Sequence, residues 1–219
     1  TNIPKDANWL SDENTVLSDC MDSENRLAVD SDVLSLARIQ GSLITDLTKL
    51  QAEQYYLATS PQKAQLFLGK NKDQIKTMQN ADIYPYLRHA YFVDAGQSDS
   101  ALPHLRRFSL QDTQLISDMS IANIEKFRVE FGVDNTADGK INTYKSRDEI
   151  TASDWQGSKI LSARLYVLAR ADHPDATFNN TLKYNERYLP FNVKNNDHFR
   201  RLLLTTTVNI NNNSMVTLQ

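Results

Sequence analysis

The sequence predicts an α+β domain with helices in its N-terminal half and an antiparallel β-sheet in its C-terminal half. Two patterns predict this: residues at helical spacing before residue 80, and apolar residues alternating with polar ones after residue 89. The length of 219 residues, with 40% hydrophobic and 23% charged residues, suits a globular protein that buries a core. We expect residues 1–219 to form one domain.

The N-terminal half begins with about thirty polar, turn-rich residues, and Val33–Ile39 is the first expected strand. The segment after it repeats mostly apolar residues at helical spacing, at Leu43, Leu47, Leu50, Gln54 and Leu57. This spacing predicts a helix over residues 45–58. Ser60-Pro61 is typical of a helix start and predicts a second short helix through Leu68 that stops at Gly69. Residues 73–78 are expected to add one more helical turn.

The C-terminal half reads as strands separated by Asp-, Asn-, Gly- and Pro-containing turns. The expected strands are 90–93, 105–110, 124–131, 159–170 and 199–210. Alternation predicts that Phe127, Val129 and Phe131 share one face of their strand. On the next long strand, the residues expected to share a face are Leu161, Ala163, Leu165, Val167 and Ala169, with Arg164 and Arg170 opposite. On the last strand they are Leu204, Thr206, Val208 and Ile210.

The charge and cysteine content exclude several classes of function. The net charge is −3, which argues against a broad electrostatic surface for nucleic acid. Cys20 is the single cysteine, so the chain contains no internal disulfide, no CxxC redox motif and no cysteine-rich zinc site. No stretch approaches the length of about 20 apolar residues that a membrane-spanning helix needs.

Catalytic motifs are absent from the sequence, which has no GxSxG, P-loop, GxGxxG or HExxH pattern. Each of the four histidines is best interpreted as a surface or turn residue; they are His89, His104, His173 and His198. In the two Arg-Arg pairs, at 106–107 and 200–201, one arginine is expected to face outward and the other to need a partner. We therefore expect a protein that is not an enzyme.

One loop resembles a calcium-binding loop. Asp134, Thr136 and Asp138 take positions one, three and five of the EF-hand pattern, and Gly139 takes position six. Position twelve is Lys145 where a glutamate should lie, and a strand rather than a helix leads into the loop. An Asp/Gly-rich hairpin turn is the favoured interpretation, with calcium as the alternative cofactor. A calorimetric titration without calcium heat, and without a change in melting temperature, would exclude the ion.

The order of features in the C-terminal half resembles the PilW family of type IV pilus minor pilins. Three stretches support this resemblance: Ile124–Gly139 with its Gly-Val-Asp and Asp-Gly elements, Asp154–Arg170, and Phe199–Val208 with its Arg-Arg start and threonine run. The resemblance covers about residues 105–210. It implies a pilin-like fold, in which a long N-terminal helix, half of it transmembrane, packs on an antiparallel sheet. The chain starts at Thr1 without such a helix, so we expect that this membrane anchor has been removed.

The resemblance also implies a function without covalent chemistry. A minor pilin of this kind primes pilus assembly, lies in the bacterial inner membrane beforehand with its soluble domain in the periplasm, and then sits at or near the extracellular tip. Its partners are other minor pilins, the major pilin and a tip adhesin, with no direct nucleic-acid contact expected. The pilus, or fimbrium, serves adhesion, twitching motility and, in some bacteria, natural transformation by DNA uptake.

Two alternatives stay open. One is a J-like minor pseudopilin at the tip of a type II secretion pseudopilus, which has the same architecture. The other is an enzyme or carbohydrate-binding module on a β-rich scaffold, which needs a pocket of convergent polar groups. For a pilin, an edge strand of the late sheet is a candidate interface, and the aromatic candidates are Trp9, Tyr55, Tyr56 and Trp155.

Overall fold

The computed structural model describes residues 26–98, 101–112, 114–156, 159–182, 184, 191, 193 and 197–210. Trp9, Cys20 and the polar tail after residue 210 lie outside the described residues. The strands are β1 (Leu34–Ile39), β2 (Tyr55–Thr59), β3 (Ala64–Leu68), β4 (Asp82–Asp94), β5 (His104–Gln111), β6 (Gln114–Ala122), β7 (Ile124–Val133), β8 (Thr143–Ser146), β9 (Ile160–Arg170) and β10 (Arg201–Asn209). The helical elements in this part of the chain are the 3-10 turns η1 (Leu47–Lys49) and η2 (Gly69–Ile75) and the one-turn helix α2 (Ala152–Gln156).

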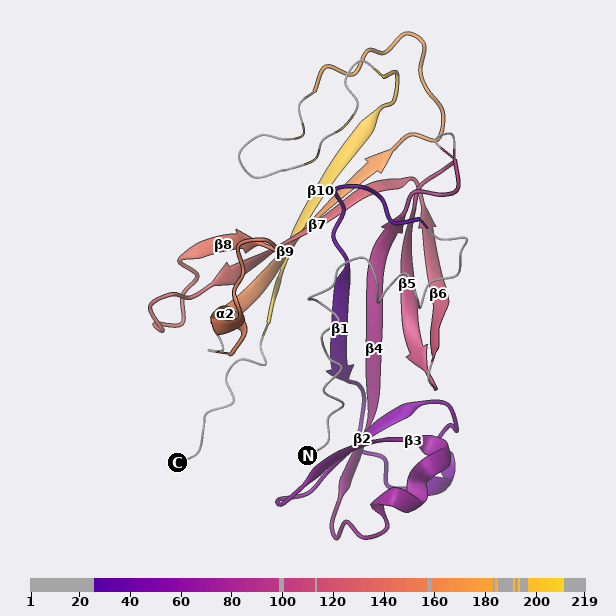
Figure 1. Cartoon of the computed structure of the whole chain (residues 1–219), viewed down its shortest axis with the longest axis vertical. Helices are drawn as coiled ribbons and strands as arrows, with labels where there is room; N and C mark the ends of the chain where they lie inside the picture. Colours follow the sequence, from indigo (N-terminus) through magenta and orange to yellow (C-terminus); the bar gives the residue numbers. More distant parts are fainter. Residues whose placement is uncertain are drawn as a thin grey trace. The chain divides into compact units, whose positions relative to one another are not determined.

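These strands form two sheets (Figure 1). The first runs in the order β3-β2-β4-β5-β6, with β1 also paired to β4. The second runs in the order β10-β9-β7-β8. The chain divides into two compact units: unit 1 contains Ser35–Tyr91 and Arg106–Ser120, and unit 2 contains Leu27–Leu34, Phe92–Leu105 and the residues from Ile121 onward.

The expected α+β class with N-terminal helices is wrong, because the structure is mostly antiparallel sheet. Most of residues 45–58, expected as a helix, lies in an irregular segment, η1 and the start of β2. The helical spacing was misleading because Leu43 and Leu47 are exposed, whereas the alternate residues Tyr56 and Ala58 are buried. Alternate burial is the strand pattern, and tyrosine favours strands.

The second expected helix, from Ser60 to Leu68, is also wrong, because it is the hairpin of β2 and β3. The Ser60 and Lys63 backbones bond to each other across the turn, at N···O distances of 2.8 and 3.3 Å. Proline fixes its own φ angle equally well for the second position of a β-turn as for the first turn of a helix. Pro61 therefore starts a turn here. The expected turn at 73–78 overlaps the end of η2.

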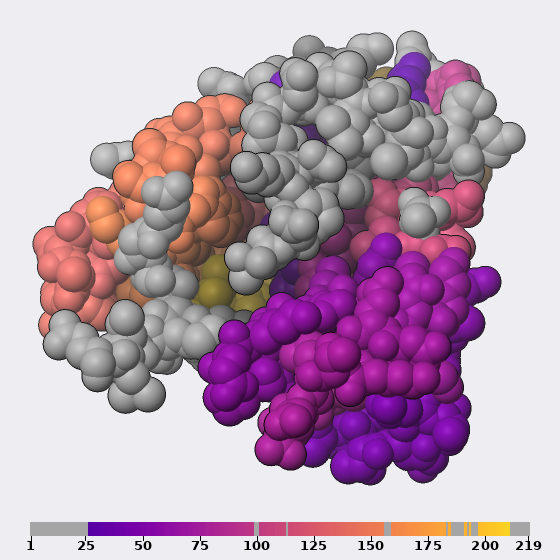
Figure 2. Space-filling view, turned by 60° about the horizontal axis from the view of Figure 1, so that its bottom comes forward, coloured from indigo at the N-terminus to yellow at the C-terminus, as the bar shows by residue number. Residues whose placement is uncertain are grey.

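Gly69 begins η2 instead of ending a helix. A Cβ atom at this position would lie 2.0 Å from the carbonyl oxygen of Gln51, so the close backbone approach requires glycine. Around it, a small core forms within the segment that is purple in Figures 1 and 2. Its buried residues are Tyr56, Ala58, Phe67, Ile75 and Ile83. This core fixes β2, β3 and η2 to the start of β4.

The strands expected in the C-terminal half are confirmed, since 90–93, 105–110 and 124–131 lie within β4, β5 and β7, and 159–170 and 199–210 contain β9 and β10. The expected strand Val33–Ile39 contains β1. The expected faces are confirmed by the register, in which Val167 lies between Leu204 and Phe127 and Leu165 lies between Thr206 and Val129. Asn123 (φ 67°) joins β6 to β7 in a left-handed conformation that asparagine tolerates. None of the helices in the described ranges is long and apolar enough to cross a membrane.

The more buried face of β9 is not its aliphatic face. The opposite face carries Tyr166 and Leu168, which form a buried cluster with Tyr184 and Phe191. The aliphatic residues Leu161, Leu165 and Val167 are only half-buried. The core of unit 2 beside β9 therefore lies on the side that also carries the arginines.

Gly132 makes the tight contact between β7 and β9, opposite Ser162. A Cβ atom at position 132 would lie 2.4 Å from the Ser162 hydroxyl oxygen and 3.0 Å from a methyl carbon of Ile141. The Ser162 hydroxyl is buried without a hydrogen-bond partner among the described residues. Position 132 therefore has room only for glycine, and the Ser162 hydroxyl contributes little to the stability of the fold.

We expect Gly132→Ala to lower the free energy of unfolding by about 1–3 kcal/mol, because the new methyl overpacks the strand contact. Ser162→Ala is expected to be close to neutral, and the double variant should recover part of the loss because the hydroxyl no longer blocks the methyl. Urea denaturation of the four proteins measures this. An alanine at 132 with wild-type stability would contradict the assigned contact.

Candidate functional site

The aliphatic face of β10 is the most exposed apolar surface of the four-stranded sheet. Leu202, Leu204 and Val208 are 60%, 52% and 52% exposed, and we call these three residues the β10 stripe. Across β9, the same face leads to Phe127 and Val129, which are buried on β7. The apolar surface is thus covered at β7 and open at β10.

β10 is also an edge strand, since it stands at the end of the order β10-β9-β7-β8. Proteins usually protect long edge strands with charges, proline or a bulge. From Leu202 to Asn209 the strand has no charge and no proline, and its pairing with β9 is unbroken. The expected candidate interface, an edge of the late sheet, is therefore a strand that is uncharged from Leu202 to Asn209.

The position of β10 is fixed by an ion cluster on its opposite face. The Arg201 side chain is only 1% exposed; its guanidinium donates to Glu125 of β7 at 2.6 and 3.1 Å and to Asp197 at 2.5 and 2.7 Å. Arg170 of β9 lies 3.9 Å from Glu125 and stacks on Phe199. Burial acts to lower the pKa of Arg201, but the bonds to Asp197 and Glu125 outweigh it and raise that pKa.

Arg200 behaves differently from its neighbour. Its side chain is 61% exposed, pairs with Asp175 at 2.8 Å and stacks on Phe178. The expectation that one arginine of this pair faces outward while the other needs a partner is confirmed. Neither forms a free phosphate site, because both guanidinium groups are bound to carboxylates.

The predicted calcium-type loop is organised by one carboxylate. Asp134, nearly buried, accepts hydrogen bonds from the backbone N–H groups of Thr136, Ala137 and Gly139 at 2.7–2.9 Å. Burial acts to raise its pKa, but these bonds are stronger and hold the pKa below its usual value. Asp138 is exposed and accepts from the Lys140 N–H at 3.0 Å.

In this geometry Asp134, Thr136 and Asp138 are residues of a turn that their own hydrogen bonds stabilise. Within the described residues, no three His, Cys, Asp or Glu side chains lie close enough together to hold a metal ion. Calcium binding by the loop stays a prediction for the titration described above.

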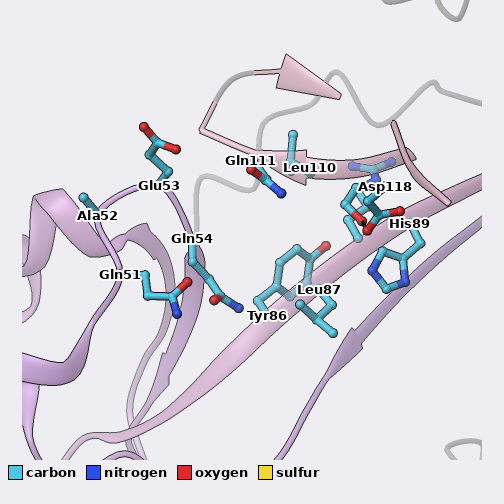
Figure 3. Close-up of a pocket in the computed structure, with 12 residues that line it drawn as sticks. Gln51, Ala52, Glu53, Gln54, Tyr86, Leu87, His89, Leu110, Gln111 and Asp118 are labelled. Carbon is cyan, nitrogen blue, oxygen red and sulfur yellow. Dashed lines mark hydrogen bonds between the residues drawn. The ribbon is translucent and has the colours of Figure 1, made fainter. Parts of the chain in front are cut away.

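Unit 1 contains a polar groove of about 390 Å³ (Figure 3). It is lined by residues 51–54, by residues 86–89 of β4, by residues 109–111 of β5 and by Asp118 of β6. The Asp118 carboxylate accepts hydrogen bonds from Nε and Nη2 of Arg107, at 2.8 and 3.0 Å, and from the Ser109 hydroxyl at 2.5 Å. Burial and the nearby Arg107 charge lower the pKa of His89, which favours its neutral imidazole.

The model of the PilW family, described as type IV pilus-assembly protein W, matches residues 90–212. The chain belongs to the PilW family. No curated protein and no solved structure matches the chain. The matched range runs from the middle of β4 through β10 and so includes the β10 stripe and the Arg201 cluster.

Membership in the PilW family indicates a role in type IV pilus assembly, a location at the cell envelope and interaction with other pilus components. The Gly-Val-Asp and Arg-Arg elements behind the expected resemblance have structural roles here. Gly132 gives strand clearance, Asp134 holds the turn, and Arg201 anchors the edge strand.

The aromatic candidates have separate environments. Tyr56 is a core residue whose hydroxyl accepts from the Gln51 N–H at 2.9 Å. Tyr55 is half-buried, and Trp155 is exposed on α2 with its ring edge-on to Phe131 at a centroid distance of 5.0 Å.

We expect Arg201→Met to lower the free energy of unfolding by about 3–5 kcal/mol, because it leaves Glu125 and Asp197 buried without their main partner. The matched control is Arg200→Met, which removes an exposed ion pair and should change stability by about 0–1 kcal/mol. Urea denaturation measures both variants. Equal effects at the two positions would contradict the anchoring role of Arg201.

Proposed function

We propose that this PilW-family chain is a non-enzymatic minor pilin that primes assembly of the type IV pilus and sits at or near its tip. Its proposed partners are other minor pilins, the major pilin and a tip adhesin. Before assembly it lies at the inner membrane with this part in the periplasm. The completed pilus would then support adhesion, twitching motility and DNA uptake.

One observation carries the proposal: an open apolar stripe on an unprotected edge strand, inside the matched range. Such a strand can accept a partner strand through backbone hydrogen bonds, while side chains on one face add apolar contact. Leu202, Leu204 and Val208 lie on the same face, two or four residues apart, and supply that contact. Pilus assembly requires protein interfaces of this kind rather than turnover.

The net charge of −3 supports a role in which this domain does not contact DNA directly. Three arginines of the two Arg-Arg pairs bind carboxylates: Arg107 binds Asp118, Arg200 binds Asp175, and Arg201 binds Glu125 and Asp197. A role in DNA uptake would then act through the assembled pilus.

In the bacterium that encodes the chain, we expect deletion of its gene to remove most surface pili, and the wild-type gene to restore them. Leu204→Glu should restore about tenfold fewer pili or less, because a charge in the centre of an apolar contact is strongly unfavourable. Electron microscopy and immunoblots of sheared pili measure the number of pili.

The control for this experiment is Leu66→Glu, which places the same charge at an exposed leucine on β3, outside the matched range. It should restore wild-type piliation. Normal piliation of the deletion strain would overturn the assembly role, and normal piliation with Leu204→Glu would overturn the assigned surface.

A further inference from the structure

The polar groove of unit 1 is lined by residues that lie outside the four-stranded sheet and its β10 stripe. One wall is the loop Gln51–Gln54, and the other wall and the floor come from β4, β5 and β6 (Figure 3). Its volume of about 390 Å³ falls in the range of about 300–1,000 Å³ that is typical of small-molecule sites.

The loop wall is held in place by backbone hydrogen bonds. The carbonyl groups of Ala52, Glu53 and Gln54 accept from the N–H groups of Lys70, Asp112 and Gly69, at 3.0, 2.8 and 2.9 Å respectively. An ion pair between Lys70 and Asp112, at 2.6 Å, links two of these donors. The loop is thus fixed before any ligand arrives, which reduces the entropic cost of binding.

The side chains on this fixed frame present unused hydrogen-bonding groups. In the described part of the chain, the amides of Gln54 and Gln111 and the carboxylate of Glu53 form no hydrogen bond. Each amide offers both a donor and an acceptor, and a carboxylate accepts only. Across the groove, the Asp118 carboxylate is already oriented by Arg107 and Ser109.

The charges of the groove are close to balanced. The lining residues carry both signs of charge: Arg88 is a cation, Glu53 is an anion, and the negative charge of Asp118 is paired with Arg107. This balance favours neither an anion nor a cation. The amides disfavour a purely apolar ligand, because its binding would remove them from water without a partner.

Tyr86 adds an aromatic ring to the groove, and Figure 3 shows Gln54 on the side of Tyr86. A ligand that fits has many neutral donors and acceptors and also an apolar face. Sugar rings have both features: hydroxyl groups around the ring and a C–H face that packs on aromatic side chains. We propose that this groove binds a neutral carbohydrate of one or two sugar rings.

The first test applies the 219-residue chain to an array of neutral oligosaccharides together with their sialylated counterparts. We expect saturable binding to a subset of the neutral glycans and weaker binding to the sialylated forms. The best-bound free glycan is then titrated into ¹⁵N-labelled chain. Shift changes should concentrate at residues 51–54, 86–89 and 109–111.

Gln54→Ala and Gln111→Ala are expected to weaken the affinity for that glycan by about tenfold each, because each removes one hydrogen-bonding partner. Glu53→Gln replaces the carboxylate with an amide of the same shape and keeps the loop intact. The matched control is Gln79→Ala, at an exposed glutamine outside the groove, which should leave the affinity unchanged.

The proposal would be overturned by no glycan bound above background, by shift changes located outside the groove, or by equal affinity in the Gln54, Gln111 and Gln79 variants. Preferential binding of the sialylated forms would also overturn it, since that requires an anion site. None of these results bears on pilus assembly, which rests on the β10 stripe of the other sheet.

Discussion

The buried ion cluster around Arg201 fixes which face of β9 and β10 packs into the core of unit 2. Arg201 joins β10 to Glu125 of β7, and Arg170 of β9 lies beside the same carboxylate. Buried charges are tolerated only when they are paired, so all three strands have to keep this register. A slip of one residue would turn Arg201 to the opposite face of the sheet. Tyr166 and Leu168 lie on the Arg201 side and pack with Tyr184 and Phe191, which places the core there.

This arrangement leaves the aliphatic face of the same strands partly uncovered. Burial falls from Phe127 on β7, through the half-buried Val167 on β9, to the exposed Leu204 on β10. The edge carries no charge that would repel a neighbouring strand. The assembly function proposed for this PilW-family chain uses this surface, because it consists of binding other subunits. The groove of unit 1 is a separate feature with polar chemistry.

The C-terminal sheet was accessible from the sequence because alternation over ten or more residues, as in β7 and β9, is a strong strand signal. The N-terminal half was not, since its leucines match a helical period by chance and Ser60-Pro61 starts a turn as readily as a helix. The sequence could not show which face of β9 is buried in the core, or how deeply its residues are buried. That face packs against Tyr184 and Phe191, which come from a later segment of the chain. The groove was missed for the same reason: Gln54 and Gln111 are far apart in sequence and belong to no motif.

The account depends most on the β10 stripe as the surface that contacts other pilus subunits. The most direct measurement is photo-crosslinking in living, piliated cells, with a photoreactive amino acid at position 204 and, as the comparison, at position 66. The account predicts that position 204 crosslinks to another pilin subunit, identified by mass spectrometry, and that position 66 does not. Absence of a pilin adduct at position 204 in cells that make normal pili, or equal adducts at both positions, would contradict it.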